Sequence, residues 1–280
     1  MLIMTTAASH NPVAQFDRAS RGPVMQALAR TGYVASGVLH ILIGWLALQV
    51  AWGSFAGSGG SGEQADQSGA LEALAGQPLG GLLLWVVVAG CAGLGVWQLV
   101  EALTQARRGG DASDRVGAGL KALGKAVAYL AIAVSAGKVA MGSGTSGSKQ
   151  SADLTAQIME APGGRVLVVL LGVGVVAIGV YHVHKGLTRK FRDDLDGRQG
   201  PAVERLAVAG YVAKGVVLGL VGVLFVVAGV HKAAGEATGL DGALRTLREQ
   251  AYGPVLLTVV ALGLAAYGLY SVARARYARL

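Results

Sequence analysis

The stretch GRVLVVLLGVGVVAIGVYHVH, residues 164–184, decides the fold class of this chain. A helix needs about 20 mainly apolar residues to cross the hydrocarbon core of a bilayer, and this stretch has that length. Five further stretches meet the same requirement, running roughly Thr31–Trp52, Leu79–Leu103, Gly117–Met141, Leu206–Val230 and Pro254–Val272. The sequence therefore predicts an all-α, polytopic membrane protein with six transmembrane helices.

The composition agrees with a lipid environment. Hydrophobic residues make up 53% of the 280 residues and charged residues only 14%, whereas soluble domains carry about 25% charged residues. The mean hydropathy is +0.52. Cys91 is the single cysteine, which excludes an internal disulfide framework and a cysteine-based metal site. We expect no cofactor.

The basic residues indicate how the chain is oriented. Cytoplasmic connections of membrane proteins carry an excess of Lys and Arg, and 18 of the 24 basic residues lie on one side of the six spans. This side contains the polar segment 1–30, the second and fourth connections, and the basic tail 274–280, so both ends are expected in the cytoplasm. The segment 1–30 lacks the apolar core of a cleavable signal peptide. The net charge of +8 is explained by this topology and by attraction to anionic headgroups on the cytoplasmic side, so we expect no nucleic-acid partner.

The spans repeat in pairs. The opening of the first span, GYVASG at 32–37, returns as GYVAKG at 210–215, and a degenerate copy occupies 124–129. GVWQLVEALT at 95–104 aligns with GVYHVHKGLT at 179–188. We predict three tandem hairpin repeats, 31–104, 117–188 and 205–273, that form one membrane domain. Because all three enter from the same side, we expect parallel repeats about an axis along the membrane normal. A pseudo-threefold ring is the simplest closed packing, although a linear row of hairpins would give the same repeats.

Each outer loop carries an amphipathic pattern. Apolar residues recur at helical spacing in the segments 65–77, 152–161 and 240–251, and Asp66, Asp153 and Asp241 stand near the segment starts. Because Asp is a good N-cap, we expect three short helices on the outer membrane face. Pro and Gly then mark the turn back into the membrane, and the Gly/Ser run at 53–62 is expected to be a flexible linker.

Glycines recur every seven residues along three of the spans. The sets are Gly37 and Gly44; Gly172, Gly179 and Gly186; and Gly215, Gly222 and Gly229. Seven residues is close to two helical turns, so each set forms one stripe. Small residues allow two helix backbones to approach closely in lipid. We interpret the stripes as packing surfaces, with a glycine-lined permeation path as the alternative.

These motifs carry a family resemblance. The GYVAKG opening, the AYGLY of the last span at 266–270 and the terminal ARYAR at 275–279 resemble a bacterial membrane family. That family is built on domain of unknown function 1206, with a two-helix unit that occurs three times. A basic residue usually precedes the second glycine of the opening; Lys214 keeps it, whereas Ser36 and Ala128 do not. The resemblance implies a bacterial plasma (inner) membrane location and no particular activity.

One ionisable side chain falls deep inside a predicted span. His40 lies ten residues beyond Arg30, which is about 15 Å along a helix and therefore near the bilayer midplane. Such groups are costly and are candidates for function. His40 and Gln49 form our candidate intramembrane polar site, for a proton or a solute. The alternative is a neutral imidazole that is hydrogen-bonded to a backbone carbonyl or a hydroxyl group.

A second candidate lies at the cytoplasmic ends of the even spans. Glu101, Lys185 and Ser271 occupy equivalent positions of the three repeats. If the repeats surround an axis, Glu101 faces Lys185, and Lys214 is a second possible partner. We predict an inner-face ion pair between Glu101 and one of these lysines. The alternative is that all of them reach the headgroups separately.

Two functions of different class follow from these features. The first is a non-enzymatic scaffold or partner-binding membrane protein, for which the sequence does not identify the protein partner. The second is a small-solute or proton transporter or channel with a path near His40. We expect no catalytic or metal site, because convergent acid, base and nucleophile residues are missing. His182 and His184 are two apart on a helix and point to different sides, which does not suit one metal ion.

Overall fold

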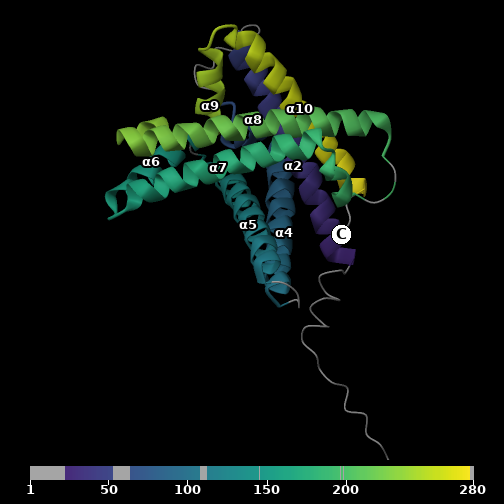
Figure 1. Ribbon diagram of the computed structural model, residues 1–280. Coiled ribbons are helices and arrows are strands. Elements are labelled where there is room, and N and C mark those ends of the chain that lie inside the picture. Colours follow the sequence, from purple (N-terminus) through teal and green to yellow (C-terminus); the bar gives the residue numbers. More distant parts are fainter. Residues whose placement is uncertain are drawn as a thin grey trace, which may run out of the picture.

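The computed structural model describes residues 23–52, 64–107, 112–144, 146–195, 197 and 199–277 (Figure 1). Six long α-helices run through this part of the chain: α2 (Pro23–Trp52), α4 (Gly80–Arg107), α5 (Ala112–Ala140), α7 (Gly164–Leu187), α8 (Pro201–His231) and α10 (Gly253–Tyr277). Each is long and apolar enough to cross a membrane. The prediction of an all-α protein with six membrane helices is therefore confirmed.

Several helices extend beyond the predicted spans. The helix α2 begins at Pro23, inside the segment that we assigned to a polar N-terminus, and α8 begins at Pro201. Proline suits the first turn of a helix, since its missing N–H has no partner there in any case. Arg274 to Tyr277, which we assigned to the tail, continue α10. The predicted linker at 53–62 lies outside the described residues.

One short helix connects the two long helices of each repeat, as predicted: α3 (Gln67–Ala75), α6 (Gly147–Glu160) and α9 (Gly239–Arg248). Asp66 is the N-cap of α3 and accepts a hydrogen bond from the Gly69 N–H at 3.0 Å. The N-cap expectation is wrong for Asp153, because α6 begins earlier and Ser146 caps it through the Lys149 N–H. The Ser146 hydroxyl accepts from one of the N–H groups that have no partner in the first turn of a helix. The expectation is also wrong for Asp241, which lies within the first turn of α9 after the N-cap residue Thr238.

The starts of these short helices are joined to one another. The Ala65 N–H donates to Asp241 Oδ1 at 2.9 Å, and the Gly147 N–H donates to Gln64 Oε1 at 3.0 Å. Burial raises the pKa of the Asp66 carboxyl; the Gly69 N–H opposes this, and the Asp241 carboxylate adds to it. The connections that carry the short helices of all three repeats therefore meet in one hydrogen-bonded junction.

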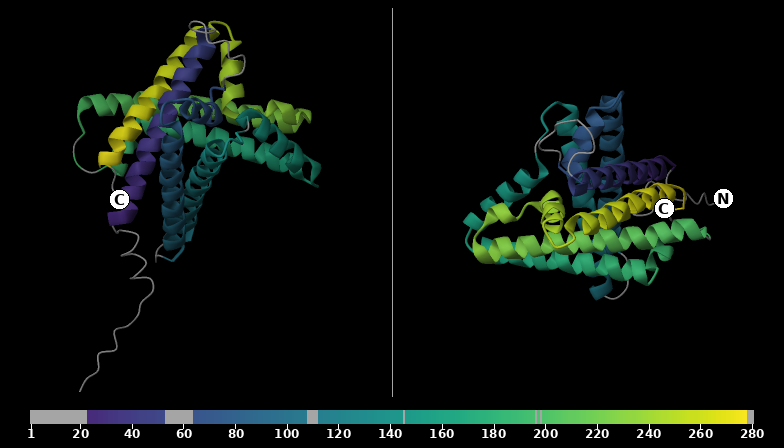
Figure 2. Two further views of the ribbon diagram at one scale, coloured as in Figure 1. Left: turned by 180° about the vertical axis from the view of Figure 1, so that it is seen from behind. Right: turned by 90° about the horizontal axis from the view of Figure 1, so that it is seen from above.

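The long helices pair between repeats. The closest pairs are α4 with α5, α7 with α8, and α10 with α2, so the second helix of each repeat packs against the first helix of the next in a cyclic order. Figure 2 shows the first and last helices, α2 and α10, side by side. In Figure 1 the α7/α8 pair runs across the view, whereas α4 and α5 run steeply downward. The pseudo-threefold axis along the membrane normal stays a prediction.

Glycines stand where these pairs approach most closely. A Cβ atom added to Gly37 would lie 2.7 Å from the Gly268 carbonyl oxygen, and one added to Gly44 would lie 2.7 Å from the Ala261 carbonyl oxygen. Such distances to backbone leave no room for a side chain. The α2/α10 pair is thus in backbone contact along one stripe.

The α7/α8 pair has the same construction with glycine on both sides. A Cβ on Gly179 would lie 2.7 Å from the Gly215 carbonyl oxygen, and a Cβ on Gly222 would lie 2.6 Å from that of Gly172. The two remaining stripe glycines of the pair meet side chains, Gly229 with Val169 at 2.7 Å and Gly186 with Tyr211 at 3.0 Å. Close backbone contact explains why small residues are needed here.

Candidate functional site at the basic end of the helices

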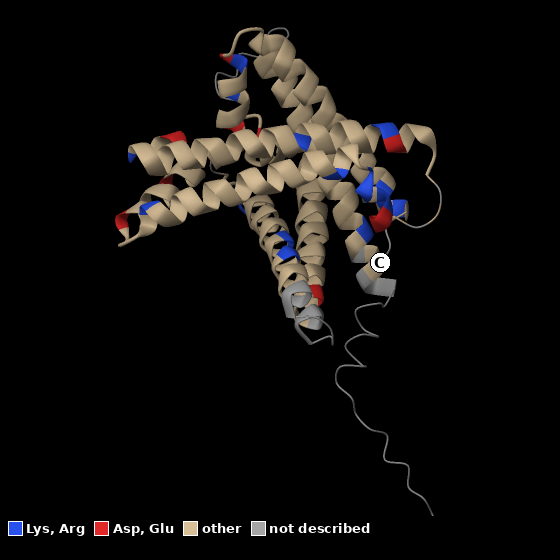
Figure 3. Cartoon of the chain, viewed as in Figure 1, with Lys and Arg blue, Asp and Glu red and all other residues tan. Residues whose placement is uncertain are grey.

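The chain folds back on itself after α7 and thereby builds one wall of the site. Arg189 has a left-handed backbone (φ 58°) and is followed by the short 3₁₀ helix η1 (Lys190–Asp194). Phe191 and Leu195 are then buried. Figure 3 shows that Lys and Arg, with a few acidic residues, gather where α7 ends and α8 begins. We call this side of the molecule the basic end.

Side chains from four long helices and η1 converge there. We define the basic–aromatic cluster as Tyr33 and His40 of α2, Lys185 of α7, Phe191 and Asp194 of η1, Tyr211 and Lys214 of α8, and Tyr267, Tyr270 and Arg274 of α10. Positions 267, 270 and 274 follow the spacing of one helix face. Repeats one and three, and the end of repeat two, therefore contribute to a single cluster.

An ion network holds the surface side of the cluster. Lys185 Nζ lies 2.5 Å from Asp194 Oδ2, and Arg274 Nη2 lies 3.6 Å from the same oxygen. Burial raises the pKa of the Asp194 carboxyl, but the positive charges of Arg274 and Lys185 outweigh it and hold the pKa below its usual range. Lys185 thus pairs with the carboxylate of Asp194, because η1 returns to the end of α7. The ion pair of Glu101 with Lys185 or Lys214 stays a prediction.

Aromatic rings fill the interior of the cluster. The Tyr211 ring stacks on Phe191 with 5.8 Å between ring centroids and meets Tyr267 edge-on at 5.4 Å. The cations lie over ring faces, with Arg274 4.7 Å from the centroid of Tyr33 and Lys185 5.4 Å from that of Tyr211. Ring faces attract cations, so the tyrosines help to hold positive charge in a low-dielectric setting.

His40 forms the deep end of the cluster. Its Nδ1 lies 2.7 Å from the Ser36 carbonyl oxygen, and its Nε2 lies 3.4 Å from Lys214 Nζ. A carbonyl only accepts hydrogen bonds, so Nδ1 carries the proton, and Nε2 of the neutral ring then accepts from the lysine. Lys214 also lies 4.2 Å from the ring centroid of Tyr267. Both ring nitrogens of His40 are therefore engaged.

The cluster does not extend past His40 along α2. Gln49 is partly buried nine residues further along this helix, which is about 13 Å away, so the two members of our predicted polar site are not brought together. Between and beyond them the helix packs through buried aliphatic residues, including Ile43, Leu46, Leu257 and Leu264. The cluster therefore joins His40 to the basic end, and aliphatic packing separates His40 from Gln49.

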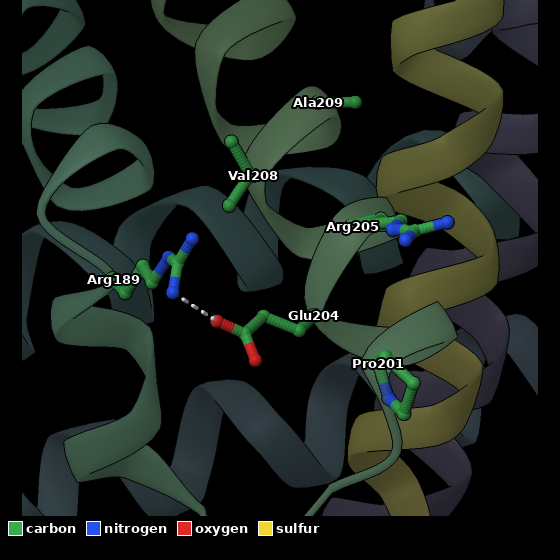
Figure 4. Close-up of a pocket in the computed structure, with 6 residues that line it drawn as sticks. All are labelled: Arg189, Pro201, Glu204, Arg205, Val208 and Ala209. Carbon is green, nitrogen blue, oxygen red and sulfur yellow. Dashed lines mark ion pairs between the residues drawn. The ribbon is translucent and has the colours of Figure 1, made fainter.

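A shallow pocket of about 400 Å³ lies beside the cluster, at the start of α8. It is lined by Arg189, Pro201, Glu204, Arg205, Val208 and Ala209 (Figure 4). Arg189 Nη1 points across the pocket to Glu204 Oε1 at 3.1 Å, and Arg192 of η1 pairs with the same oxygen. The pairing fixes η1 to α8 and leaves the pocket open to solvent.

The described residues contain no group of three or more His, Cys, Asp or Glu side chains that could hold a metal ion. His182 Nδ1 lies 2.8 Å from the Ile178 carbonyl oxygen within its own helix. Its ring lies 5.8 Å from Tyr211, at the border of the cluster.

Sequence reasoning missed most members of the cluster. Tyr211 and Tyr267 stood out only as parts of repeated motifs. Arg274 was counted only as a charge of the tail, and Asp194 was not considered. The spacing of Tyr267, Tyr270 and Arg274 on one face was the one available signal. Nothing local indicated that η1 returns to α7.

Six helices of membrane-spanning length and apolarity, in three repeats of two, define an integral membrane protein. The chain belongs to the family described as Domain of Unknown Function (DUF1206), which matches three times, at residues 31–105, 120–189 and 209–278. The resemblance and the threefold repeat predicted from the sequence are thus confirmed.

A relative supports the same assignment. The uncharacterized protein YxxB of Bacillus subtilis (strain 168) is 27% identical to this chain over 260 residues, which is 91% of this chain and 92% of the relative. No solved structure matches the chain. Neither the family description nor the relative indicates an enzymatic activity.

Proposed function

We propose that this protein is a non-enzymatic scaffold or partner-binding protein of the bacterial plasma membrane, with both ends in the cytoplasm. The main support is the one-sided arrangement of its polar groups. The basic–aromatic cluster reaches from the basic end to His40, and buried aliphatic residues such as Ile43 and Leu264 follow it. A transport path needs polar or hydrated groups on both sides of a central site.

The helix pairing adds to this support. The stripe glycines bring α2 into backbone contact with α10, and α7 with α8, so these surfaces are occupied by neighbouring helices. Both ring nitrogens of His40 have hydrogen-bond partners, the Ser36 carbonyl oxygen and Lys214 Nζ. This arrangement favours a firmly packed core over a solute path.

The second candidate is a proton or small-solute transporter or channel. The observation that favours it is the contact between His40 and Lys214, two ionisable groups within membrane helices. Such groups mark ion and proton pathways in many membrane proteins. This function requires that water reach His40.

Thiol accessibility distinguishes the two functions. The variant His40→Cys, in a Cys91→Ala background, is treated in native membranes with a membrane-impermeant thiol reagent. Cys91 is fully buried among apolar residues, so its replacement by alanine is mild. Tyr252→Cys, at a residue that is 84% exposed, is the reactive control, and Ala47→Cys, at a fully buried residue, is the unreactive control.

We expect the His40→Cys variant to remain unlabelled, like the Ala47→Cys control. Labelling of position 40 at a rate near that of position 252 would mean that water reaches the middle of the membrane. That result would reject the scaffold function in favour of transport.

A further inference from the structure

We propose that the basic–aromatic cluster binds a phosphate group, supplied by a phospholipid headgroup or by free phosphate. The first reason is charge. The described residues of the cluster include three cations, Lys185, Lys214 and Arg274, but one carboxylate. That carboxylate, of Asp194, contacts Lys185 and Arg274, whereas Lys214 contacts the neutral ring of His40. Lys185 is itself buried. Buried positive charge is costly without compensation, and an anion would supply it.

The second reason is a pair of unused donors. Tyr270 Oη and Arg274 Nε are buried and have no hydrogen-bond partner within the described part of the chain. The Tyr270 side chain is fully buried, 5.6 Å from the Tyr211 ring and 5.8 Å from that of Phe191. Buried polar groups are normally paired. The two donors are four residues apart on one face of α10, so the oxygens of one ligand can reach both.

The third reason is that the cluster already holds an anionic group. The Asp194 carboxylate lies 2.5 Å from Lys185 Nζ and 3.6 Å from Arg274 Nη2. It is carried by the short helix η1, which is not a membrane helix, and its side chain is 30% exposed. Asp194 therefore marks the open side of the cluster and competes with an incoming anion for the same two cations.

Phosphate fits these donors better than a second carboxylate would. Its oxygens accept from a guanidinium fork and from a hydroxyl at the same time, and Arg is the preferred partner of phosphate. Phospholipid headgroups lie at the level where charged helix ends meet the bilayer surface. This site does not depend on the scaffold function proposed above, because a transporter could hold the same ligand.

The test uses the purified full-length protein in a neutral detergent. The unfolding temperature is measured against increasing phosphatidylglycerol, zwitterionic phosphatidylcholine or inorganic phosphate, because a ligand of the native state raises it. We expect a saturable rise with phosphatidylglycerol, with inorganic phosphate, or with both. A rise with phosphatidylglycerol alone assigns the site to a lipid headgroup, and a rise with inorganic phosphate assigns it to a free phosphate.

Four variants test the residues. Arg274→Gln is expected to weaken the apparent affinity about tenfold and Tyr270→Phe about threefold, since each loses a donor to an anion. Asp194→Asn is expected to strengthen it several-fold, because a competing carboxylate is removed. Arg276→Gln is the matched control: it removes the same charge from an exposed site on the same helix, and its affinity should stay unchanged.

The affinity is expected to fall in Arg274→Gln and Tyr270→Phe and to rise in Asp194→Asn. A general loss of stability would not change the affinity in opposite directions. If Arg274→Gln does not fold, Tyr270→Phe and Asp194→Asn carry the test. The proposal is overturned if neither ligand stabilises the wild-type protein. It is equally overturned if Arg274→Gln and Arg276→Gln lose affinity to the same extent, or if Tyr270→Phe and Asp194→Asn both bind as the wild type does.

Discussion

At the scale of single residues, the cluster depends on carboxylate and imidazole groups that join different helices. Asp194 links Lys185 of α7 to Arg274 of α10, and His40 links α2 to Lys214 of α8. Each contact lies between groups whose other neighbours are mostly aromatic or apolar. Removal of one partner therefore leaves a cation without compensation, which costs more than the contact itself contributes.

The variant Asp194→Asn tests this network. Because the folded pKa of Asp194 lies below its usual value, its contribution to stability is present above the unfolded pKa and is lost as the pH falls through the folded pKa. We expect the variant to lose about 1–2 kcal/mol of unfolding free energy at pH 7, after allowance for the partial exposure of the carboxylate.

The measurement is an unfolding titration at several pH values between 7 and 3. The loss should shrink as the pH drops below about 4, the usual range of an aspartate. A loss that is equal at all pH values would show that charge is not its cause.

At the scale of helices, glycine positions differ in what lies opposite them. Gly179 and Gly174 belong to the same helix, α7, but only Gly179 faces the backbone of α8. A Cβ on Gly179 would lie 2.6 Å from the Gly219 nitrogen, whereas a Cβ on Gly174 would meet nothing within 4 Å. Membrane helices that pair through small residues are sensitive to added volume at such points.

The paired variants Gly179→Ala and Gly174→Ala test this reading. We expect Gly179→Ala to lower stability by about 1–3 kcal/mol, the usual cost of overpacking. Gly174→Ala should be neutral or gain up to about 1 kcal/mol from helix propensity. Unfolding temperatures in detergent measure both, and equal effects would contradict a packing role for the stripe.

Turns between helices matter as much as the helices themselves. The left-handed Arg189 and the buried Phe191 direct η1 back under the helix ends, which positions Asp194. Arg192 and Arg189 then attach η1 to Glu204 of α8. A segment that counts as a polar loop by composition thus supplies one side of the candidate site.

At the scale of the whole molecule, a repeat is not a self-contained unit. Each second helix packs most closely against the first helix of the next repeat, and the cycle closes when α10 meets α2. Repeats that cannot bury their own faces need their neighbours for stability. The junction of the outer connections, in which Asp241 accepts from the Ala65 N–H, adds a second link between repeats one and three.

The cyclic packing of helices between repeats predicts that two fragments of the chain associate. We expect fragments 1–107 and 112–280, produced together, to co-purify from detergent, because the cut leaves the α2/α10 and α4/α5 pairs intact. Gly37→Leu in the first fragment should reduce recovery of the second about tenfold, since a Cβ there would lie 2.7 Å from the Gly268 carbonyl oxygen.

Gly81→Leu, in the same fragment, is the control, as a Cβ at this position would meet nothing within 4 Å. Recovery unaffected by Gly37→Leu, or fragments that do not associate at all, would contradict the cyclic pairing.

The candidate site was predictable only in part. The position of His40 along its helix indicated a polar group deep in the membrane. The distribution of Lys and Arg along the sequence indicated a basic side. The carboxylate that Lys185 contacts was not predicted, because the sequence comparison considered only Glu101 of the equivalent position as its partner. In the structure, the carboxylate that contacts Lys185 is that of Asp194 in η1.

The sequence by itself determined six long helices, three two-helix repeats and a short helix within each repeat. Apolar length and periodicity are local properties, so they can be read without knowledge of the fold. Only the tertiary structure decided which repeats pair and which side chains meet. The contact of His40 with Lys214 joins residues 174 positions apart, and such contacts depend on how the helices cross, which no local pattern encodes.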